Sequence, residues 1–416
     1  MVPKLRFAEF SEGWIKDKIS SFIKDGFIIG HLDGNHGALY PRSEEFSQNG
    51  VPYISATDFS SGEVDFNSCK YLPISRANKF KKGISKSGDV LFAHNATVGP
   101  VSLLNTNHDF VILSTTATYF RCDTNKLNNV FLKSSLESEH FVKQYSSIMS
   151  QSTRNQVPIT AQRDLIISVP DIREQNKIAD FLSSVDEKIT LLNKQYDLLC
   201  QYKKGMMQKI FSQELRFKDD SGRAFPEWKS TILDEVVDLI TNGLALDQND
   251  SKNGYPVSRI ETISEHCINM NKVGFVNTDN DISNYKLNYG DMLFSNINSI
   301  SHIGKIAYFN IDDTLYHGMN LLRIVIKNSH CKLFFYYQLT TDTNKKYFES
   351  RANQAVSQAS INQTELRKTP VQVPCQEEQT KIASFLSALD DKIAVKKAEL
   401  DKLKTWKQGL LQQMFV

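Results

Sequence analysis

The sequence predicts an α+β protein in which two similar mixed α/β domains are joined by two long helices, which form an antiparallel intramolecular coiled coil with pseudo-twofold symmetry. Three observations predict this fold. The phrase EQNKIADFLSSVDEKI at 174–189 returns as EQTKIASFLSALDDKI at 378–393. Both phrases open stretches in which apolar residues recur every three or four positions, as in a coiled coil. Short β-branched and aromatic segments fill the chain before each phrase, as strands do.

Length and composition set the class of protein. A chain of 416 residues is long enough for two or three domains, and 40% hydrophobic with 23% charged residues is typical of a globular protein. No apolar run approaches the roughly 18 residues that a membrane span needs, and the charged N-terminal segment does not resemble a secretory signal, so we expect a cytoplasmic protein without a membrane role. The six cysteines form no C-x-x-C pair, which favours buried thiols over a zinc site or disulfides. A net charge of +2 decides nothing about a nucleic-acid partner.

The repeat extends over the whole chain. Residues 170–212 and 374–416 share 18 identities in 43 ungapped positions. Upstream, GDVLF (88–92) matches GDMLF (290–294), and LRFAEFSEGW (5–14) matches LRFKDDSGRAFPEW (215–228). ITAQRDL (159–165) faces INQTELR near 361–367. These matches predict a tandem duplication with a first domain at 1–169, a central helix at 170–212, a second domain at 213–373 and a final helix at 374–416.

Inside each domain the strand signals are short and are separated by Gly, Asn and Pro. We expect strands in DVLFA (89–93), VILSTTATYF (111–120) and LIISV (165–169), and in DMLFS (291–295), KIAYF (305–309) and LLRIVI (321–326). One helical stretch interrupts each set, at 126–149 and at 331–349.

The long helices carry a heptad seam. Its apolar residues are Ile178, Leu182, Val185, Ile189, Leu192 and Leu199 in the first copy, and Ile382, Leu386, Leu389, Ile393, Leu400 and Leu403 in the second. Both copies place a lysine, Lys203 or Lys407, at the same seam position. A polar seam residue can fix register and orientation, or the lysine can snorkel at a helix end; the sequence leaves both readings open. Some 39 helical residues would form a rod of about 58 Å.

The order of variable domain, then P-x-x-x-EQ-x-KIA-x-FL-x-x-x-D-x-KI, then the same again, closely resembles the specificity subunit of type I restriction-modification systems. QSTRNQVPITAQRDLIISVP (151–170) resembles the segment that leads each target recognition domain of that family into its helix. The resemblance implies that each domain reads one half of a bipartite sequence in double-stranded DNA, while the helices set the spacer. It also implies two methyltransferase subunits and restriction subunits as partners, which use S-adenosylmethionine, ATP and Mg²⁺, with no cofactor in this chain.

DNA contact requires side chains that read base edges or hold phosphates, placed in loops on the exposed side of a domain. The candidates are rich in amides and hydroxyls: His94, Asn95, Thr97, Gln151, Ser152, Thr153, Arg154, Asn155 and Gln156 in the first half, and Asn296, Asn298, Ser299, His302, Gln354 and Gln358 in the second. Arg154 has no obvious counterpart in the second half. The alternative is that these are ordinary polar turns whose amides cap their own backbone.

Charges on the two helices are the candidates for partner docking. We expect an exposed platform formed by Glu174, Lys177, Asp186, Lys188, Glu378, Lys381, Asp390 and Lys392. Two rival interpretations remain: a coiled-coil adaptor that binds only protein, and a self-sufficient nuclease or methyltransferase.

Catalytic motifs are not found in the sequence. It has no phosphate-binding loop and no methyltransferase Asn-Pro-Pro-aromatic stretch. The Pro170-Asp171 and Asp186-Glu187-Lys188 pair imitates a nuclease site, but it flanks the heptad seam, and the second copy has Cys375 in place of Asp171. We therefore expect no catalytic and no metal-binding residues in this chain.

Overall fold

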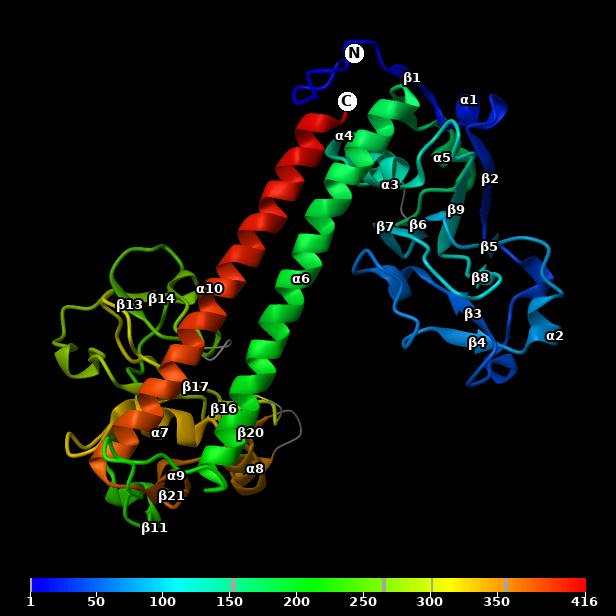
Figure 1. The fold of residues 1–416 in the computed structure, drawn as a ribbon. Coiled ribbons are helices and arrows are strands. Elements are labelled where there is room, and N and C mark those ends of the chain that lie inside the picture. The colour runs from blue at the N-terminus through cyan, green and yellow to red at the C-terminus, as the bar shows by residue number, and fades with distance from the viewer. Residues whose placement is uncertain (1, 151–154, 264–266, 301, 355–357) are drawn as a thin grey trace. The chain divides into compact units, whose positions relative to one another are not determined.

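The computed structural model describes residues 2–150, 155–263, 267–300, 302–354 and 358–416. The chain forms two compact units. Unit 1 comprises Met1–Lys194 and Ala398–Val416, and unit 2 comprises Gln195–Lys397. Both long helices, α6 (Ile172–Phe211) and α10 (Gln376–Met414), are divided between the units, so that each unit contains a segment of both (Figure 1).

Unit 1 is built on a four-stranded antiparallel sheet in the order β2 (Ile28–Asp33), β9 (Ala117–Cys122), β6 (Val90–Asn95) and β7 (Thr97–Leu103). A second sheet has the order β4 (Lys70–Leu72), β3 (Val51–Ile54), β8 (Val111–Leu113) and β5 (Ile84–Ser85), with β3 and β8 parallel. The remaining elements are β1 (Ile15–Lys18) paired with β10 (Ile166–Val169), and helices α1 (Ile19–Lys24), α2 (Ile74–Ala77), α3 (Asn129–Glu137), α4 (Glu139–Ser150) and α5 (Ile159–Asp164).

Unit 2 repeats the main sheet as β12 (Val237–Asn242), β18 (Leu322–Ile326), β15 (Met292–Phe294) and β17 (Ile306–Tyr308). Its smaller sheets are β13 (Tyr255–Val257) with β14 (Gly274–Val276), β11 (Lys229–Ile232) with β21 (Pro370–Val373), and β16 (Ile297–Asn298), β20 (Ala359–Ser360) and β19 (Asn353–Gln354). Its helices are α7 (Lys332–Leu339), α8 (Asp342–Arg351) and α9 (Gln363–Arg367). The α+β class and the duplication are therefore confirmed.

Five of the six predicted strands are present within a few residues. The sixth, 111–120, forms two strands, β8 and β9, in different sheets, and each predicted single helix likewise forms two helices. The stretch 126–149 forms α3 and α4, and 331–349 forms α7 and α8. Ser138 separates the first pair in an extended conformation, and its hydroxyl accepts a hydrogen bond from the Phe141 amide. Thr341 caps α8 in the same way by accepting from the Asn344 amide. Hydroxyl residues at these positions stabilise a new helix start more than they stabilise continuation of the old helix.

The heptad seam is confirmed. All twelve predicted residues are buried or half-buried. In unit 2, Tyr196 of α6 lies under the Lys397 ammonium, and Lys203, seven residues further along α6, pairs with Asp390. Asp390 precedes Lys397 in α10, so the two helices run in opposite directions. This is the antiparallel pairing that the sequence predicts. In unit 1, Ile178, Leu182 and Val185 of α6 share one apolar cluster with Leu410 and Met414 of α10.

The seam lysines are ion-paired rather than free at a helix end. The Lys203 ammonium lies 2.5 Å from an Asp390 carboxylate oxygen in unit 2, and the Lys407 ammonium lies 2.6 Å from Asp186 in unit 1. Both lysine side chains are about one-fifth exposed or less. Because the same pair occurs at equivalent positions of the two repeats, it fixes the register of α6 against α10 in each unit.

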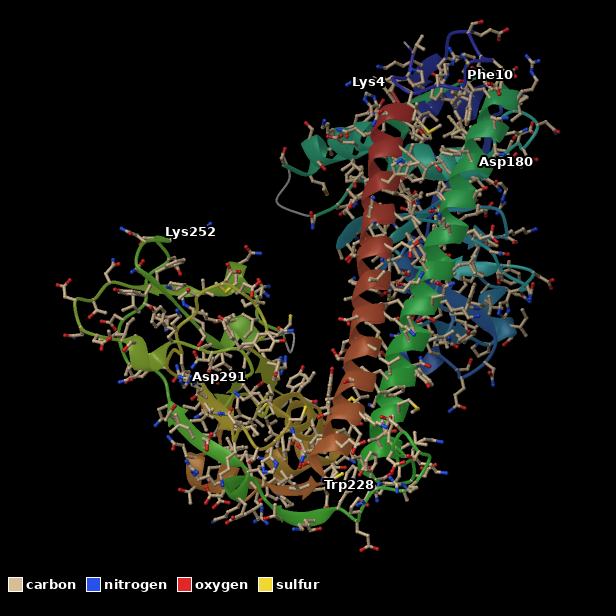
Figure 2. All side chains as sticks on the ribbon, turned by 60° about the vertical axis from the view of Figure 1, so that its left-hand side comes forward. Lys4, Phe10, Asp180, Trp228, Lys252 and Asp291 are labelled. Atoms are coloured by element: carbon tan, nitrogen blue, oxygen red, sulfur yellow. The ribbon has the colours of Figure 1, made fainter. Side chains whose placement is uncertain are left out.

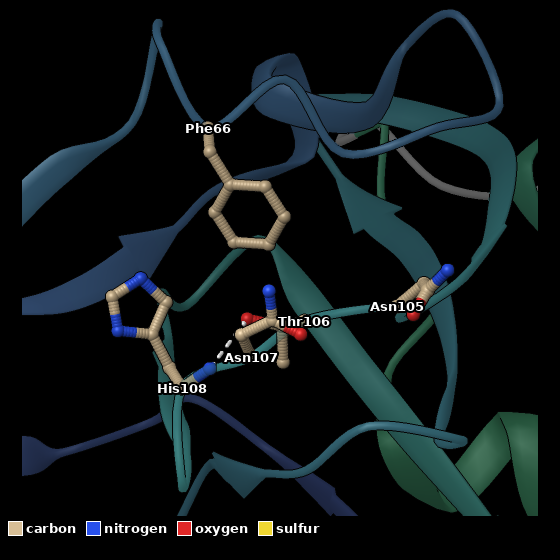
Figure 3. A pocket seen from close by; sticks show the side chains of 5 residues that line it. All are labelled: Phe66, Asn105, Thr106, Asn107 and His108. Atoms are coloured by element: carbon tan, nitrogen blue, oxygen red, sulfur yellow. Dashed lines mark hydrogen bonds between the residues drawn. The ribbon is translucent and has the colours of Figure 1, made fainter.

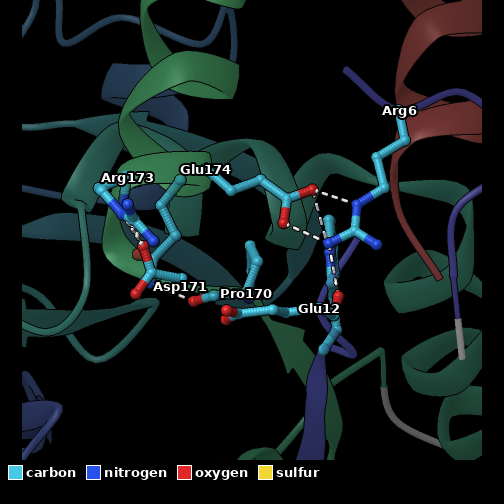
Figure 4. A network of polar contacts seen from close by, with 8 residues as sticks. Arg6, Glu12, Pro170, Asp171, Arg173 and Glu174 are labelled. Carbon is cyan, nitrogen blue, oxygen red and sulfur yellow. Dashed lines mark hydrogen bonds and ion pairs between the residues drawn. The ribbon is translucent and has the colours of Figure 1, made fainter. Parts of the chain in front are cut away.

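The Glu-Gln pair that opens each repeated phrase anchors the start of its helix. The Glu174 carboxylate accepts from Nε and Nη2 of Arg6 at 2.7 Å and from the Trp14 indole at 3.2 Å (Figure 4). In unit 2, Glu378 accepts equivalent bonds from Arg216 at 2.8 Å and from Trp228 at 2.9 Å, and Trp228 lies near the end of the helix pair in Figure 2.

The following glutamines fasten a neighbouring loop. Gln175 accepts from the Asn128 amide and donates to the Pro170 carbonyl, while Gln379 accepts from the Cys331 amide and donates to the Pro374 carbonyl. These contacts attach the end of β10 or β21, the start of the long helix and the start of α3 or α7 to one another. They explain why the duplicated phrase begins with these two residues.

Cys69 and Cys122 are buried, and burial raises the pKa of each thiol to about 12, but Cys267 is exposed, so the expectation of buried thiols is wrong for that residue. Across the described parts of the chain, no helix combines the length and the apolar character needed to cross a membrane.

Candidate nucleic-acid interface

In unit 1 the structure brings two predicted polar runs together. The turn between β6 and β7 is formed by Asn95, Ala96 and Thr97, with Ala96 in a left-handed conformation. The Ala96 amide donates to the Asn155 carbonyl at 3.1 Å, and Asn95 forms a β-bridge with Gln156. We call Asn95, Thr97, Asn155 and Gln156, which are exposed or half-exposed, edge 1.

Unit 2 has the corresponding arrangement. Asn298 in β16 and Gln354 in β19 both face Ala359 of the intervening strand β20, with Gln358 directly before it. Ser299 and His302 follow Asn298 and are exposed. We call Asn298, Ser299, Gln354 and Gln358 edge 2. The prediction placed these residues in loops, but Asn95, Thr97, Asn298 and Gln354 lie in strands at a sheet margin, where backbone pairing holds them more rigidly than a loop would.

His94 departs from the prediction. It lies in β6, is 3% exposed, and burial lowers its pKa below the ordinary value. It is therefore not an exposed loop residue. Its backbone carbonyl accepts from the Val157 amide at 2.8 Å, and at the equivalent place in unit 2 the Asn296 carbonyl accepts from the Ile361 amide at 2.9 Å. Asn296 is half-buried.

Four predicted contacts, Gln151, Ser152, Thr153 and Arg154, lie outside the described residues. Whether any residue of edge 1 or edge 2 touches DNA stays a prediction.

The predicted docking platform on the helices needs correction at two positions. Glu174 and Glu378 are 1% and 0% exposed, because each carboxylate is enclosed by its arginine and tryptophan. They are not surface charges. Asp186 and Asp390 are partly exposed but are committed to the seam lysines. Lys381 is half-buried and bound to Asp220, whereas Lys177, Lys188 and Lys392 remain exposed.

Exposed apolar residues on the helices were missed by the sequence analysis. Leu191 and Trp406 in unit 1, and Leu198, Tyr202 and Val395 in unit 2, are between 49% and 65% exposed. Leu191 and Val395 occupy the same position of the repeat, as do Tyr202 and Trp406. Most of these apolar residues could have been identified in the sequence, because apolar residues occur at the same positions of both repeated helices although those positions are outside the heptad seam.

Unit 1 also carries an open cavity of about 370 Å³ between the 66 and 105–108 segments (Figure 3). It is lined by Phe66, Asn105, Thr106, Asn107 and His108, and the Phe66 and His108 ring centroids are 6.1 Å apart.

Unit 1 also has a run of exposed lysines: Lys79, Lys81, Lys82 and Lys86. The matching stretch 281–288 of unit 2 contains one lysine and one aspartate. Among the described residues, no group of three or more His, Cys, Asp or Glu side chains is placed to hold a metal ion.

Comparison with known proteins identifies relatives along nearly the whole chain. The family model described as type I restriction modification DNA specificity domain matches residues 24–200 and again 226–405. The MjaX type I restriction enzyme specificity subunit of Methanocaldococcus jannaschii is 40% identical over 210 residues, so the match spans about half of each protein, 49% of this chain and 49% of the relative. The MjaVIII specificity subunit of the same organism is 26% identical over 380 residues, which is 86% of this chain and 87% of that protein.

Solved structures share the fold. The S subunit of a type I restriction-modification system from M. genitalium superposes with a TM-score of 0.59 at 16% identity, covering 100% of this chain and 99% of that one. A chain from a structure of a type I R-M system, solved to explain complex assembly and conformational transition, gives a TM-score of 0.57 at 17% identity, covering 97% and 98%. None of these comparisons supports the interpretation of the chain as a coiled-coil adaptor without DNA recognition.

Proposed function

Because this chain belongs to the family of type I restriction-modification DNA specificity subunits, we propose that it reads a bipartite sequence in double-stranded DNA, one half-site with each unit. The observation that supports this most directly is that a polar margin recurs in both units: edge 1 at the end of β6 and β7 in unit 1, and edge 2 on the β16–β20–β19 sheet in unit 2. Asn and Gln amides carry a donor and an acceptor side by side, which suits the edge of adenine in the major groove.

Subunits of this family do not carry out catalysis; methyl transfer and DNA cleavage belong to partner subunits. For this chain the partners would be two methyltransferase subunits together with restriction subunits. S-adenosylmethionine, ATP and Mg²⁺ would be used in those partners. We place the complex in the cytoplasm with the DNA that it reads.

The exposed apolar residues favour a docking place for the methyltransferase. In unit 1 the Trp406 ring packs edge-on against Phe181 at 6.2 Å and remains half-exposed, and Leu191 of the facing helix is exposed as well. In unit 2 Tyr202, Leu198 and Val395 are exposed on the same two helices. Aromatic side chains of this kind are typical anchors of protein interfaces. Because the positions recur, each unit would receive one copy of the partner.

A domain exchange tests the proposal. When the unit 1 segment 1–165 is replaced by the matching segment of another member, one half of the methylated motif should change and the other half should stay. A replacement of both halves, with folding intact, contradicts independent reading. As a second test, affinity of the assembled complex for random duplex should fall steeply with salt, because phosphate contacts release counterions. A protein-only adaptor would show no such loss.

A further inference from the structure

The two units leave a polar side chain unpaired at the same point of the fold. Gly88-Asp89 and Gly290-Asp291 begin equivalent strands, and each aspartate pairs with an arginine of the neighbouring strand, Arg121 at 2.7 Å or Arg323 at 2.6 Å. His94 and Asn296 each lie six residues after the glycine, at equivalent positions of the two units.

Neither side chain has its hydrogen-bonding groups satisfied. Both ring nitrogens of His94 and the Oδ1 atom of Asn296 are enclosed, and none of them forms a hydrogen bond of normal geometry with a described residue, although the backbone of Val157 and of His94 itself approaches the His94 ring. The strand residues before them, from Val90 to Ala93 and from Met292 to Phe294, are buried and apolar. An apolar residue would therefore fit the surroundings of this position.

By contrast, the buried amide that donates to the Val157 carbonyl is fully paired. Gln162, which is 0% exposed, lies under the same segment and satisfies its amide fully. Its Oε1 atom bonds to His31, and its Nε2 atom donates to Thr118 Oγ1 and to the Val157 carbonyl. Buried polar groups without a partner destabilise a fold, so their retention calls for a reason other than stability.

The position of both residues at the polar margins supplies that reason. The His94 carbonyl binds the Val157 amide next to Gln156 of edge 1, and the Asn296 carbonyl binds the Ile361 amide two residues beyond Ala359, which faces edge 2. We propose that His94 and Asn296 are equivalent specificity-determining residues. Because these atoms are enclosed in the free protein, the adjoining edge shifts when DNA binds, and each free group then pairs with the edge of a base in its half-site, directly or through a bridging water. This inference rests on the proposed function.

The test uses the full chain assembled with its methyltransferase partner, with the methylated motif read by sequencing and the melting temperature measured in parallel. In Asn296→Leu, whose side chain is close in size, we expect an unchanged or higher melting temperature. We also expect at least a tenfold loss of discrimination at one base pair of the second half-site, with the first unaffected. His94→Leu should relax one position of the first half-site only. Asn296→His should change the preferred base rather than abolish the preference.

Gln338→Leu is the matched control. This buried amide is fully bonded, donating to the Gln372 carbonyl and accepting from its amide, and it lies outside both edges. Its loss should lower the melting temperature and leave the motif unchanged, the opposite pattern. The inference is overturned if either leucine variant at His94 or Asn296 keeps parental discrimination within twofold, relaxes both half-sites alike, or merely destabilises as the control does. If the parent complex yields no bipartite motif at all, the proposed function itself fails before any variant is compared.

Discussion

The buried Glu174–Arg6 pair should be a main stabilising contact of unit 1. Glu174→Ala removes three hydrogen bonds and leaves Arg6, whose side chain is 10% exposed, without its counter-charge. Breaking one partner out of a buried ion pair typically costs about 3–5 kcal/mol. A unit of this size loses about 2–4 °C in melting temperature per kcal/mol, so the unit 1 transition should fall by roughly 6–20 °C.

Calorimetry on the whole chain measures this change, with hydrogen exchange assigning the shifted transition to unit 1. Glu9→Ala is the matched control, because the Glu9–Lys177 pair is 3.5 Å apart and both side chains are more than half exposed. It should cost less than about 1 kcal/mol. Glu378→Ala should reproduce the loss in unit 2 and leave unit 1 unchanged.

Arg6→Met combined with Glu174→Leu should be less destabilising than Glu174→Ala alone, because no buried charge is left unpaired. A Glu174→Ala variant that melts within about 2 °C of the parent, or an exposed control that costs as much, would contradict a main stabilising role for this ion pair.

Three other predictions concern the seam, pH and connectivity. Lys407→Met should destabilise unit 1 by about 1–3 kcal/mol, because Lys133 must then balance both Asp186 and Glu137. Lys203→Met should cost unit 2 less because Tyr337 still donates to Asp390, and chemical denaturation compares the two variants. Burial lowers the pKa of His31 and of His317 to about 4, below the ordinary 6.5, so the folded state binds fewer protons than the unfolded state in this range. The free energy of unfolding should therefore be fully present above pH 6.5 and decline as the pH falls from 6.5 towards 4. His31→Phe should flatten that decline in thermal melts of unit 1. The Leu5 amide donates to the Gln413 carbonyl in unit 1, and the Leu215 amide donates to the Lys209 carbonyl at the equivalent place in unit 2. A circularly permuted chain that is opened between Ser212 and Gln213 and linked from Val416 to the N-terminus should therefore fold with an unchanged melting profile. A molten product would contradict this equivalence.

Local patterns made much of this fold predictable. Periodicity alone identified the seam, since residues from Ile178 to Leu199 can be buried together only on one face of a helix. Repetition identified the duplication, and β-branched segments identified most of the strands. The sequence match between ITAQRDL (159–165) and INQTELR (361–367) aligned the two short helices incorrectly. The structure instead places Pro158 and Asn362 at the same helix start, two residues out of that alignment.

Only the tertiary structure decided which polar residues are exposed. Glu174 follows the charge pattern of a helix surface, but Arg6, 168 residues earlier, reaches its carboxylate and buries it. Asn95 and Gln156 carry no mutual signal in the sequence and meet because the Val157 amide docks on the last residues of β6. The sequence by itself determined the repeat, the strands and the apolar seam, because these depend on neighbours along the chain. The buried carboxylates, the two edges and the unpaired His94 and Asn296 depend on contacts between distant segments, which no local pattern encodes.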